Sequence, residues 1–154
     1  MNRVSIQAIL AEIGVDMSVF PDEHHLSSWT GMCPGNEESA GKRLRSAVRH
    51  GNRWLRRDLS EAAWGASQTQ TSYFAAQYRR LAPRRGKKRA LITVAHSLLI
   101  VIYHVLKEHK DYQDLGRDYF DCHSAERLQR YLVHRLEALG HEVSLRPRKL
   151  DQEN

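Results

Sequence analysis

Cysteine is scarce in this sequence, where Cys33 and Cys122 are the two among 154 residues. Two cysteines cannot form the disulfide framework of a small secreted domain, so we expect a reducing, cytoplasmic environment. The amino terminus, MNRVSIQAILAEIG, lacks the long apolar segment and the small-residue cleavage site of a secretory signal peptide. The nine histidines show no zinc-ligand spacing with these cysteines. The sequence therefore predicts no metal or other cofactor held by this chain.

Acidic residues are in the minority, because 18 Asp and Glu stand against 24 Lys and Arg and the pI is near 9.6. This balance suits a polyanion such as DNA or RNA, and it also suits an anionic membrane surface. The 41% of hydrophobic residues is enough for one core, which excludes global disorder. Four aspartates lack EF-hand spacing, and we expect them to be solvated or to cap helices: Asp111, Asp114, Asp118 and Asp121.

No apolar run reaches the ~20 residues that a membrane-spanning helix needs. The nearest candidate, ALITVAHSLLIVIYHVL, lies within a predicted helix over residues 87–107. One polar strip at helical spacing interrupts it: Thr93, His96, Ser97, Tyr103 and His104. The strip favours a central core helix over a membrane span, so we expect no membrane partner.

Hydrophobic periodicity predicts a mainly α, compact multi-helix domain over residues 1–145, followed by a flexible tail over residues 146–154. Gly14 and Pro83 are expected to end the first and the fourth helix. The predicted helices cover residues 4–13, a short segment after Asp22, residues 52–67, 72–81 and 87–107, and a last segment from Ser124 to Gly140.

The remaining segments have simpler expectations. The last helix should bury one stripe, made of Leu128, Leu132, Leu136 and Leu139. At most one short strand is expected, at residues 141–145, and the Gly/Pro-rich residues 31–41 should form a loop. We expect the three tryptophans to anchor the core and not to stack on bases: Trp29, Trp54 and Trp64.

A cationic block, KRLRSAVRHGNRWLRR, runs from Lys42 to Arg57 without an acidic residue. Arginine dominates it, and guanidinium groups match phosphate oxygens in a bidentate way. We therefore predict nucleic-acid contact here, over the alternative of a solvated basic face. The residues expected to make this contact are Gly41, Lys42, Arg43, Arg45, Arg49, Asn52, Arg53, Arg56 and Arg57.

A second basic block, RRLAPRRGKKR, covers residues 79–89. Lys87 and Lys88 fall at the amino end of a predicted helix, a position that disfavours cations unless an anion is bound. A solvated loop is the alternative, and the sequence leaves both open.

Ser39 lies between small residues in the segment PGNEESAGK. Gly41 gives a large substrate access to the backbone, and Lys42 can neutralise a phosphate in a transition state. The segment is not a P-loop, because five residues separate Gly35 from Gly41 and no hydroxyl follows Lys42. A loop serine alone does not indicate a nucleophile, since no partner base is evident nearby.

Four separated segments occur in one order: ILAEIGVDMSVFP, LSSWTGMCPGNEESAGKR, GNRWLRRDLSEAAW and YRRLAPRRGKKRALITVAHSLLIVIYHVL. Together, from residue 4 to residue 145, they resemble the carboxy-terminal domain of insertion-sequence transposases of the 110/116/902 type. The resemblance implies an RNA-guided DNA recombinase, with DNA, a guide RNA and other transposase subunits as partners. It also implies an amino-terminal RuvC-like domain, absent from this sequence, that holds a divalent metal. A truncated protein is therefore expected.

The same resemblance implies a role for Ser39. The family motif P-x-x-x-x-S-x-G-K falls on Pro34, Ser39, Gly41 and Lys42, and its serine is the DNA nucleophile. Ser39 would form a transient phosphoserine link to DNA, and no high-energy cofactor would be needed. The family pattern GN-x-x-LR begins at Gly51. The alternative is a non-catalytic, nucleic-acid-binding remnant of a transposase.

Overall fold

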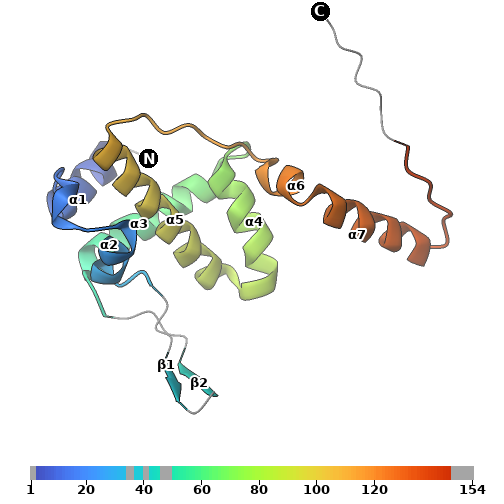
Figure 1. Cartoon of the computed structure of the whole chain (residues 1–154), viewed down its shortest axis with the longest axis horizontal. Helices are drawn as coiled ribbons and strands as arrows, with labels where there is room; N and C mark the ends of the chain where they lie inside the picture. The colour runs from blue at the N-terminus through green and yellow to red at the C-terminus, as the bar shows by residue number, and fades with distance from the viewer. Residues whose placement is uncertain (1–2, 34–36, 40–41, 46–49, 147–154) are drawn as a thin grey trace, which may run out of the picture. The chain divides into compact units, whose positions relative to one another are not determined.

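The computed structural model describes residues 3–33, 37–39, 42–45 and 50–146, with the two strands described as backbone alone (Figure 1). Contacts divide the chain into unit 1, Met1–Tyr119, and unit 2, Phe120–Asn154. The predicted tail at 146–154 lies, apart from Arg146, outside the described residues.

Unit 1 is mainly helical, which confirms the predicted fold class. Its elements are α1 (Arg3–Ile13), the 3-10 helix η1 (Met17–Val19), α2 (Glu23–Thr30), β1 (Glu37–Ser39), β2 (Lys42–Arg45), α3 (Arg53–Gln68), α4 (Tyr73–Arg85) and α5 (Lys87–Glu108). Gly14 follows α1 with φ 73°, as expected for a residue that ends a helix. Asp22 caps α2, because its carboxylate accepts the N–H of His25 at 2.8 Å.

The core is built around α5, which packs against α2, α3 and α4. Its buried residues are Ala90, Val94, Ala95, Leu99 and Tyr103. By length and composition alone, α5 is the one helix of the described residues that could cross a membrane. Its packing against three other helices is that of the core helix predicted from the sequence.

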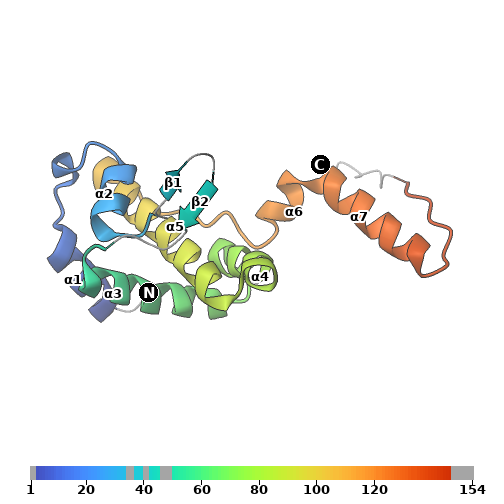
Figure 2. The ribbon, with the colours of Figure 1, turned by 90° about the horizontal axis from the view of Figure 1, so that it is seen from below.

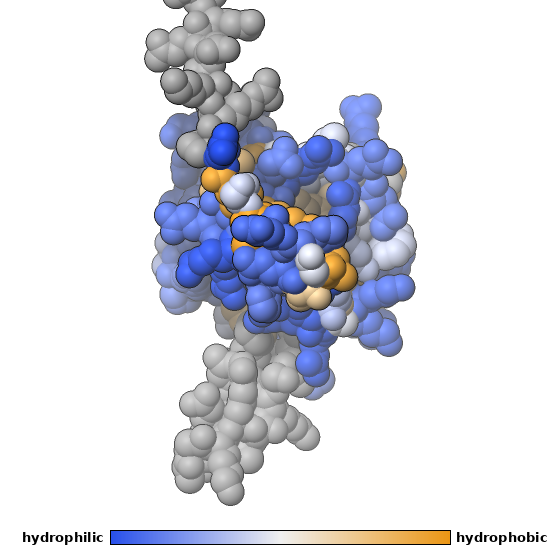
Figure 3. Space-filling model, turned by 90° about the vertical axis from the view of Figure 1, so that its right-hand side faces the viewer, coloured by the Kyte–Doolittle hydropathy of each residue, from blue (hydrophilic) through white to orange (hydrophobic). Residues whose placement is uncertain are grey.

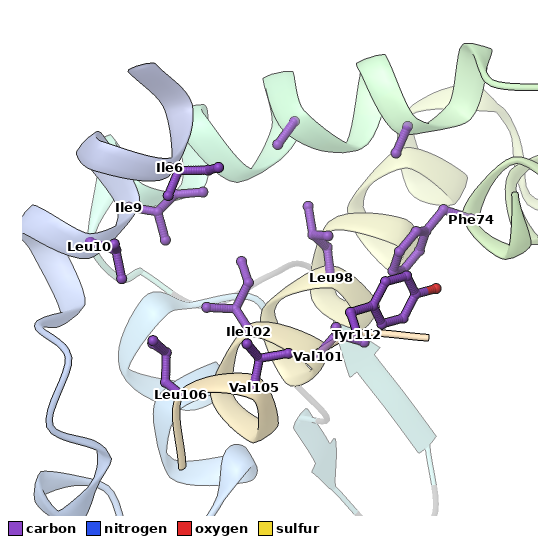
Figure 4. Close-up of a pocket in the computed structure, with 12 residues that line it drawn as sticks. Ile6, Ile9, Leu10, Phe74, Leu98, Val101, Ile102, Val105, Leu106 and Tyr112 are labelled. Carbon is purple, nitrogen blue, oxygen red and sulfur yellow. The ribbon is translucent and has the colours of Figure 1, made fainter. Parts of the chain in front are cut away.

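An apolar cavity of about 430 Å³ lies beside α5 (Figure 4). Ile6 and Leu10 of α1, Phe74 of α4 and Leu98 of α5 point into it, and Tyr112 lies at one side. Burial is the main cause that raises the pKa of Tyr112, to about 12. Because no residue that lines the cavity carries a charge, we assign it to the core and not to catalysis.

Helix α4 does not end at Pro83, so that prediction is wrong. The helix continues through Pro83 to Arg85, and only Gly86 separates it from α5. Pro83 lacks the N–H of one helical hydrogen bond, and it stands two residues before the last residue of α4. The N–H of Gly86 then bonds to the carbonyl of Ala82 at 3.0 Å and closes the last turn. The second basic block therefore lies on two helix ends and not in a loop.

Residues 31–41, expected to form a loop, contain one strand of a hairpin. Strands β1 and β2 are antiparallel, with Glu37 paired to Arg45, Glu38 to Arg43 and Ser39 to Lys42. The pairing sets acidic residues opposite basic ones, which favours a hairpin over an open loop. Residues 141–145 are described and carry no strand.

Unit 2 contains α7 (Ala125–Ala138) and, apart from its first residue, α6 (Tyr119–His123). Ser124 precedes α7 as predicted, but its side chain makes no capping hydrogen bond. The predicted buried stripe is wrong, because no residue of α7 is buried and Leu132, Leu136 and Leu139 are 49%, 43% and 70% exposed. Periodicity defines the apolar face of a helix but does not supply the surface that covers it. Figure 3 shows hydrophobic residues, in orange, that lie at the surface among hydrophilic ones.

Candidate nucleic-acid interface

The hairpin brings Ser39 and Lys42 together. Ser39 is the last residue of β1, Lys42 is the first of β2, and their Cα atoms are partners in the register. Directly opposed residues of an antiparallel pair have Cβ atoms about 5 Å apart. Pro34, Gly41 and Arg49 lie outside the described residues, and of Ser39, Lys42, Arg43 and Arg45 the structure describes the backbone alone. The two residues that carry the proposed chemistry are thus cross-strand neighbours.

The carboxyl half of the cationic block begins α3, which is strongly amphipathic. Leu55, Leu59 and Ala63 are fully buried on one face. Arg53 and Arg57 are exposed, and Arg56 is half-buried. Helix α3 thus has a packing face and a cationic face. A buried face of this kind holds the arginine backbones in fixed positions.

Asn52 is the N-cap of α3. Its side-chain oxygen accepts the N–H groups of Trp54 at 3.0 Å and Leu55 at 3.1 Å. Its amide nitrogen donates to the carboxylate of Glu12 in α1 at 2.5 Å. The side chain predicted to contact nucleic acid is thus occupied by a helix cap and a link between two helices. Glu12 was not predicted, because 40 residues separate it from Asn52 and no local pattern joins them.

Gly51, the first residue of the GN pattern, is packed against the end of α2. A Cβ at this position would collide with the backbone of Thr30 and Gly31. Thr30 is itself fully buried, and its hydroxyl donates to the carbonyl of Leu26 at 2.8 Å. Gly51 and Asn52 therefore fix where α3 begins relative to α2 and α1, and so where its arginines lie.

Arg53 and Arg57, at this end of α3, have weak partners. The guanidinium of Arg53 lies 4.6 Å from the ring centroid of Trp54. Arg57 pairs with Glu61 at 3.1 Å, but both side chains are more than 60% exposed. Exposed pairs of this kind contribute little to stability, so a phosphate can replace Glu61 as the partner of Arg57.

The three tryptophans are not core anchors, contrary to expectation. Trp29, Trp54 and Trp64 are 45%, 53% and 53% exposed. Trp29 packs on Phe20 and Trp64 on Tyr78, with ring centroids 5.8 Å and 6.5 Å apart. A large ring commonly packs one edge and leaves the other in solvent, and smaller side chains fill this core.

The acidic residues give no sign of a metal centre. Among the described residues, no three His, Cys, Asp or Glu side chains gather as a metal site would require. Asp114 accepts the N–H of Tyr73 at 2.9 Å, at the first residue of α4, and that of Gly116 at 2.7 Å. Of the four aspartates that were expected to be solvated or to cap helices, Asp114 is thus confirmed as a residue that binds a helix end.

Comparison with known proteins identifies the family. Residues 1–79 match the profile described as the transposase IS116/IS110/IS902 family. The match spans α1 to the middle of α4 and includes Ser39 and the whole cationic block. No curated protein and no solved structure matches the chain. The resemblance over residues 80–145 remains a prediction. Since the matched segment is more than half of the 154 residues, the chain belongs to the IS116/IS110/IS902 family of transposases, and this supports a role in transposition.

Proposed function

We propose that this chain is the DNA-binding, serine-nucleophile part of an insertion-sequence transposase. The observation that supports it best is the register of the hairpin, which pairs Ser39 with Lys42 inside the family match. A nucleophile beside a cation is an arrangement that favours attack on a phosphodiester.

In the proposed reaction, the Oγ of Ser39 attacks the phosphorus of a scissile phosphodiester. A phosphoserine ester forms, the bond to one strand end breaks, and the proton lost by Ser39 is balanced by the proton gained at the released hydroxyl. The number of phosphate esters is unchanged, so strand exchange needs no high-energy cofactor. Lys42 stabilises the charge that develops on the phosphate oxygens.

The rest of the cationic block holds the DNA backbone in this proposal. Arg43, Arg45 and Arg49 follow Lys42 in the sequence, and Arg53, Arg56 and Arg57 lie on α3. Because glycine has no side chain, Gly41 would not obstruct a DNA strand that approaches Ser39. Asn52 acts by positioning the helix, because its side chain caps α3.

The complete reaction also needs parts that we infer from the family. We propose that a RuvC-like domain supplies a divalent metal, that a guide RNA selects the DNA, and that other transposase subunits complete the active site. The reaction would take place in the cytoplasm.

Ser39→Ala tests the nucleophile in this chain joined to a RuvC-like domain of the same family. We expect recombination and the covalent protein–DNA adduct to disappear, while DNA affinity changes by less than twofold. Ser28→Ala is the matched control, since Ser28 is an exposed serine on α2, and it should keep full activity. Normal recombination by Ser39→Ala would remove the nucleophile assignment. DNA binding without any adduct in the unaltered protein would favour the non-catalytic remnant.

A further inference from the structure

A second cationic surface lies where α4 meets α5. We name it the α4–α5 corner and define it by five exposed cations: Arg84, Arg85, Lys87, Lys88 and Arg89. The sequence contains no acidic residue between Glu61 and Glu108. None of the five forms a salt bridge within the described part of the chain. Within the described part of the chain, the corner is therefore a concentrated positive charge without a counterion.

The backbone of the corner is fixed by hydrogen bonds at both helix ends. Gly86, with φ 84°, is the single residue between the helices and caps both of them. Its N–H bonds to Ala82 and its carbonyl accepts the N–H of Ala90, each at 3.0 Å. Ala90 is fully buried and so anchors the first turn of α5 in the core. A positive φ of this kind is readily adopted by glycine. The backbone that carries the five cations is thus held in place before any ligand arrives, which lowers the entropic cost of binding.

The electrostatics of α5 point to an anion outside the protein. Lys87, Lys88 and Arg89 occupy the first turn, where the helix dipole is positive and repels them. This turn contains no acidic residue, and no side chain caps it by a hydrogen bond. Arg84 and Arg85 end α4, where the dipole is favourable to cations, but they add to the same positive field. A bound phosphate would relieve the repulsion and accept the uncapped N–H groups.

The surface around the corner fits a nucleic-acid backbone better than a membrane. Within the described residues, no large hydrophobic side chain between Trp64 and Tyr112 is exposed. A helix that binds in a bilayer interface needs such side chains to insert. Three of the five cations are arginines, whose guanidinium groups suit phosphate oxygens.

The corner is separate from the first turn of α3. In Figures 1 and 2, α3 begins at the end of unit 1 where α1 and α2 lie, and α4 meets α5 at the opposite end. One phosphate cannot contact both places. A long polyanion can, because duplex DNA carries a charge for about each 1.7 Å of its axis.

We propose that the α4–α5 corner is a second binding site for the phosphodiester backbone of nucleic acid. The inference rests on the nucleic-acid partner of the proposed function, but not on the chemistry of Ser39. It gives the chain two separated phosphate contacts, so that a bound duplex or folded RNA is oriented as well as held.

The test uses the triple variant Lys87→Gln, Lys88→Gln, Arg89→Gln in the full chain. Fluorescence anisotropy measures its affinity for a 30-base-pair DNA duplex and for an RNA hairpin over a series of KCl concentrations. Each lost phosphate contact should reduce the slope of log Kobs against log [KCl] by ~0.9 for duplex DNA, so we expect a reduction of about 3. A reduced slope with either polymer supports the site and identifies its ligand, and an unchanged slope with both overturns it.

The matched control removes the same charge elsewhere, by Arg127→Gln, Arg130→Gln and Arg135→Gln on exposed positions of α7. Its slope should stay at the unaltered value, and an equal loss in both variants would overturn the inference, because net charge alone would then explain the effect. If circular dichroism shows that the first variant is unfolded, Arg84→Gln with Arg85→Gln replaces it, with an expected slope reduction of about 2.

A third variant, Arg53→Gln, Arg56→Gln, Arg57→Gln, separates this inference from the proposed function. A reduced slope of log Kobs against log [KCl] in the α3 variant alone would support DNA binding by the cationic block and refute the second site. Loss in the α4–α5 variant alone would support the second site and contradict the role assigned to α3.

Discussion

Replacing Asn52 with alanine separates its role as a helix cap from the nucleic-acid contact expected from the sequence. The substitution removes the acceptor for the N–H groups of Trp54 and Leu55, and with it the link to Glu12. Loss of an N-cap costs about 1 kcal/mol of folding free energy. The exposed link to Glu12 adds less, because water replaces it. We therefore expect the free energy of unfolding to fall by about 1–1.5 kcal/mol.

Urea denaturation followed by circular dichroism measures this change. Asn52→Asp is the informative companion, because aspartate keeps the capping oxygen but sets a second carboxylate beside Glu12. In the background Glu12→Gln, that repulsion disappears and Asn52→Asp should recover stability. The double-mutant cycle thus isolates the link between α1 and α3 from the cap.

DNA affinity provides the opposing readout. If Asn52 acts as a cap, the folded Asn52→Ala protein should bind duplex DNA within about twofold of the unaltered chain, because the arginines of α3 keep their charge. An unchanged free energy of unfolding together with a tenfold loss of affinity would refute the structural role of Asn52 and restore it as a contact residue.

Two further predictions concern the same end of unit 1. Gly51→Ala should destabilise the protein by ~1–3 kcal/mol, because the added Cβ meets the backbone of Thr30. Gly65→Ala, at an open position within α3, should stabilise the protein by ~0.5–1 kcal/mol. Thermal unfolding compares the two variants, and equal effects would contradict the close packing of Gly51. The hydrogen bond between the His25 ring and Asp22 is the largest cause that holds the pKa of the Asp22 carboxyl below its ordinary value of 3.8. The stabilisation from Asp22 is then complete above that value and is lost as the pH falls through the lowered pKa. The Asp22→Asn variant should therefore lose less stability in acid than the unaltered protein does. Urea denaturation from pH 5 downward measures this, and midpoints that fall equally with pH in both proteins would show that Asp22 has no such role.

The helices of unit 1 were predictable because their causes are local. The apolar stripe of α3, the capping residues Asp22 and Asn52, and Gly14 after α1 all act within a few residues of the backbone that they organise. The cationic block was visible for the same reason, since it is continuous in sequence. Of the candidate site, the motif with Ser39 and Lys42 was visible, but the pairing that makes them neighbours was not.

The features that the sequence did not determine depend on contacts made at a distance. Pro83 remained inside a helix because α4 had almost ended and α5 followed directly. The leucines of α7 showed where that helix could pack, but only a facing surface decides whether it does. The link from Asn52 to Glu12 joins residues 40 positions apart. Local chemistry thus determined which segments are helical and where the charged residues gather. Tertiary packing alone decided which helix faces are buried and which distant side chains meet, because burial and distant contacts depend on how the helices approach one another in space.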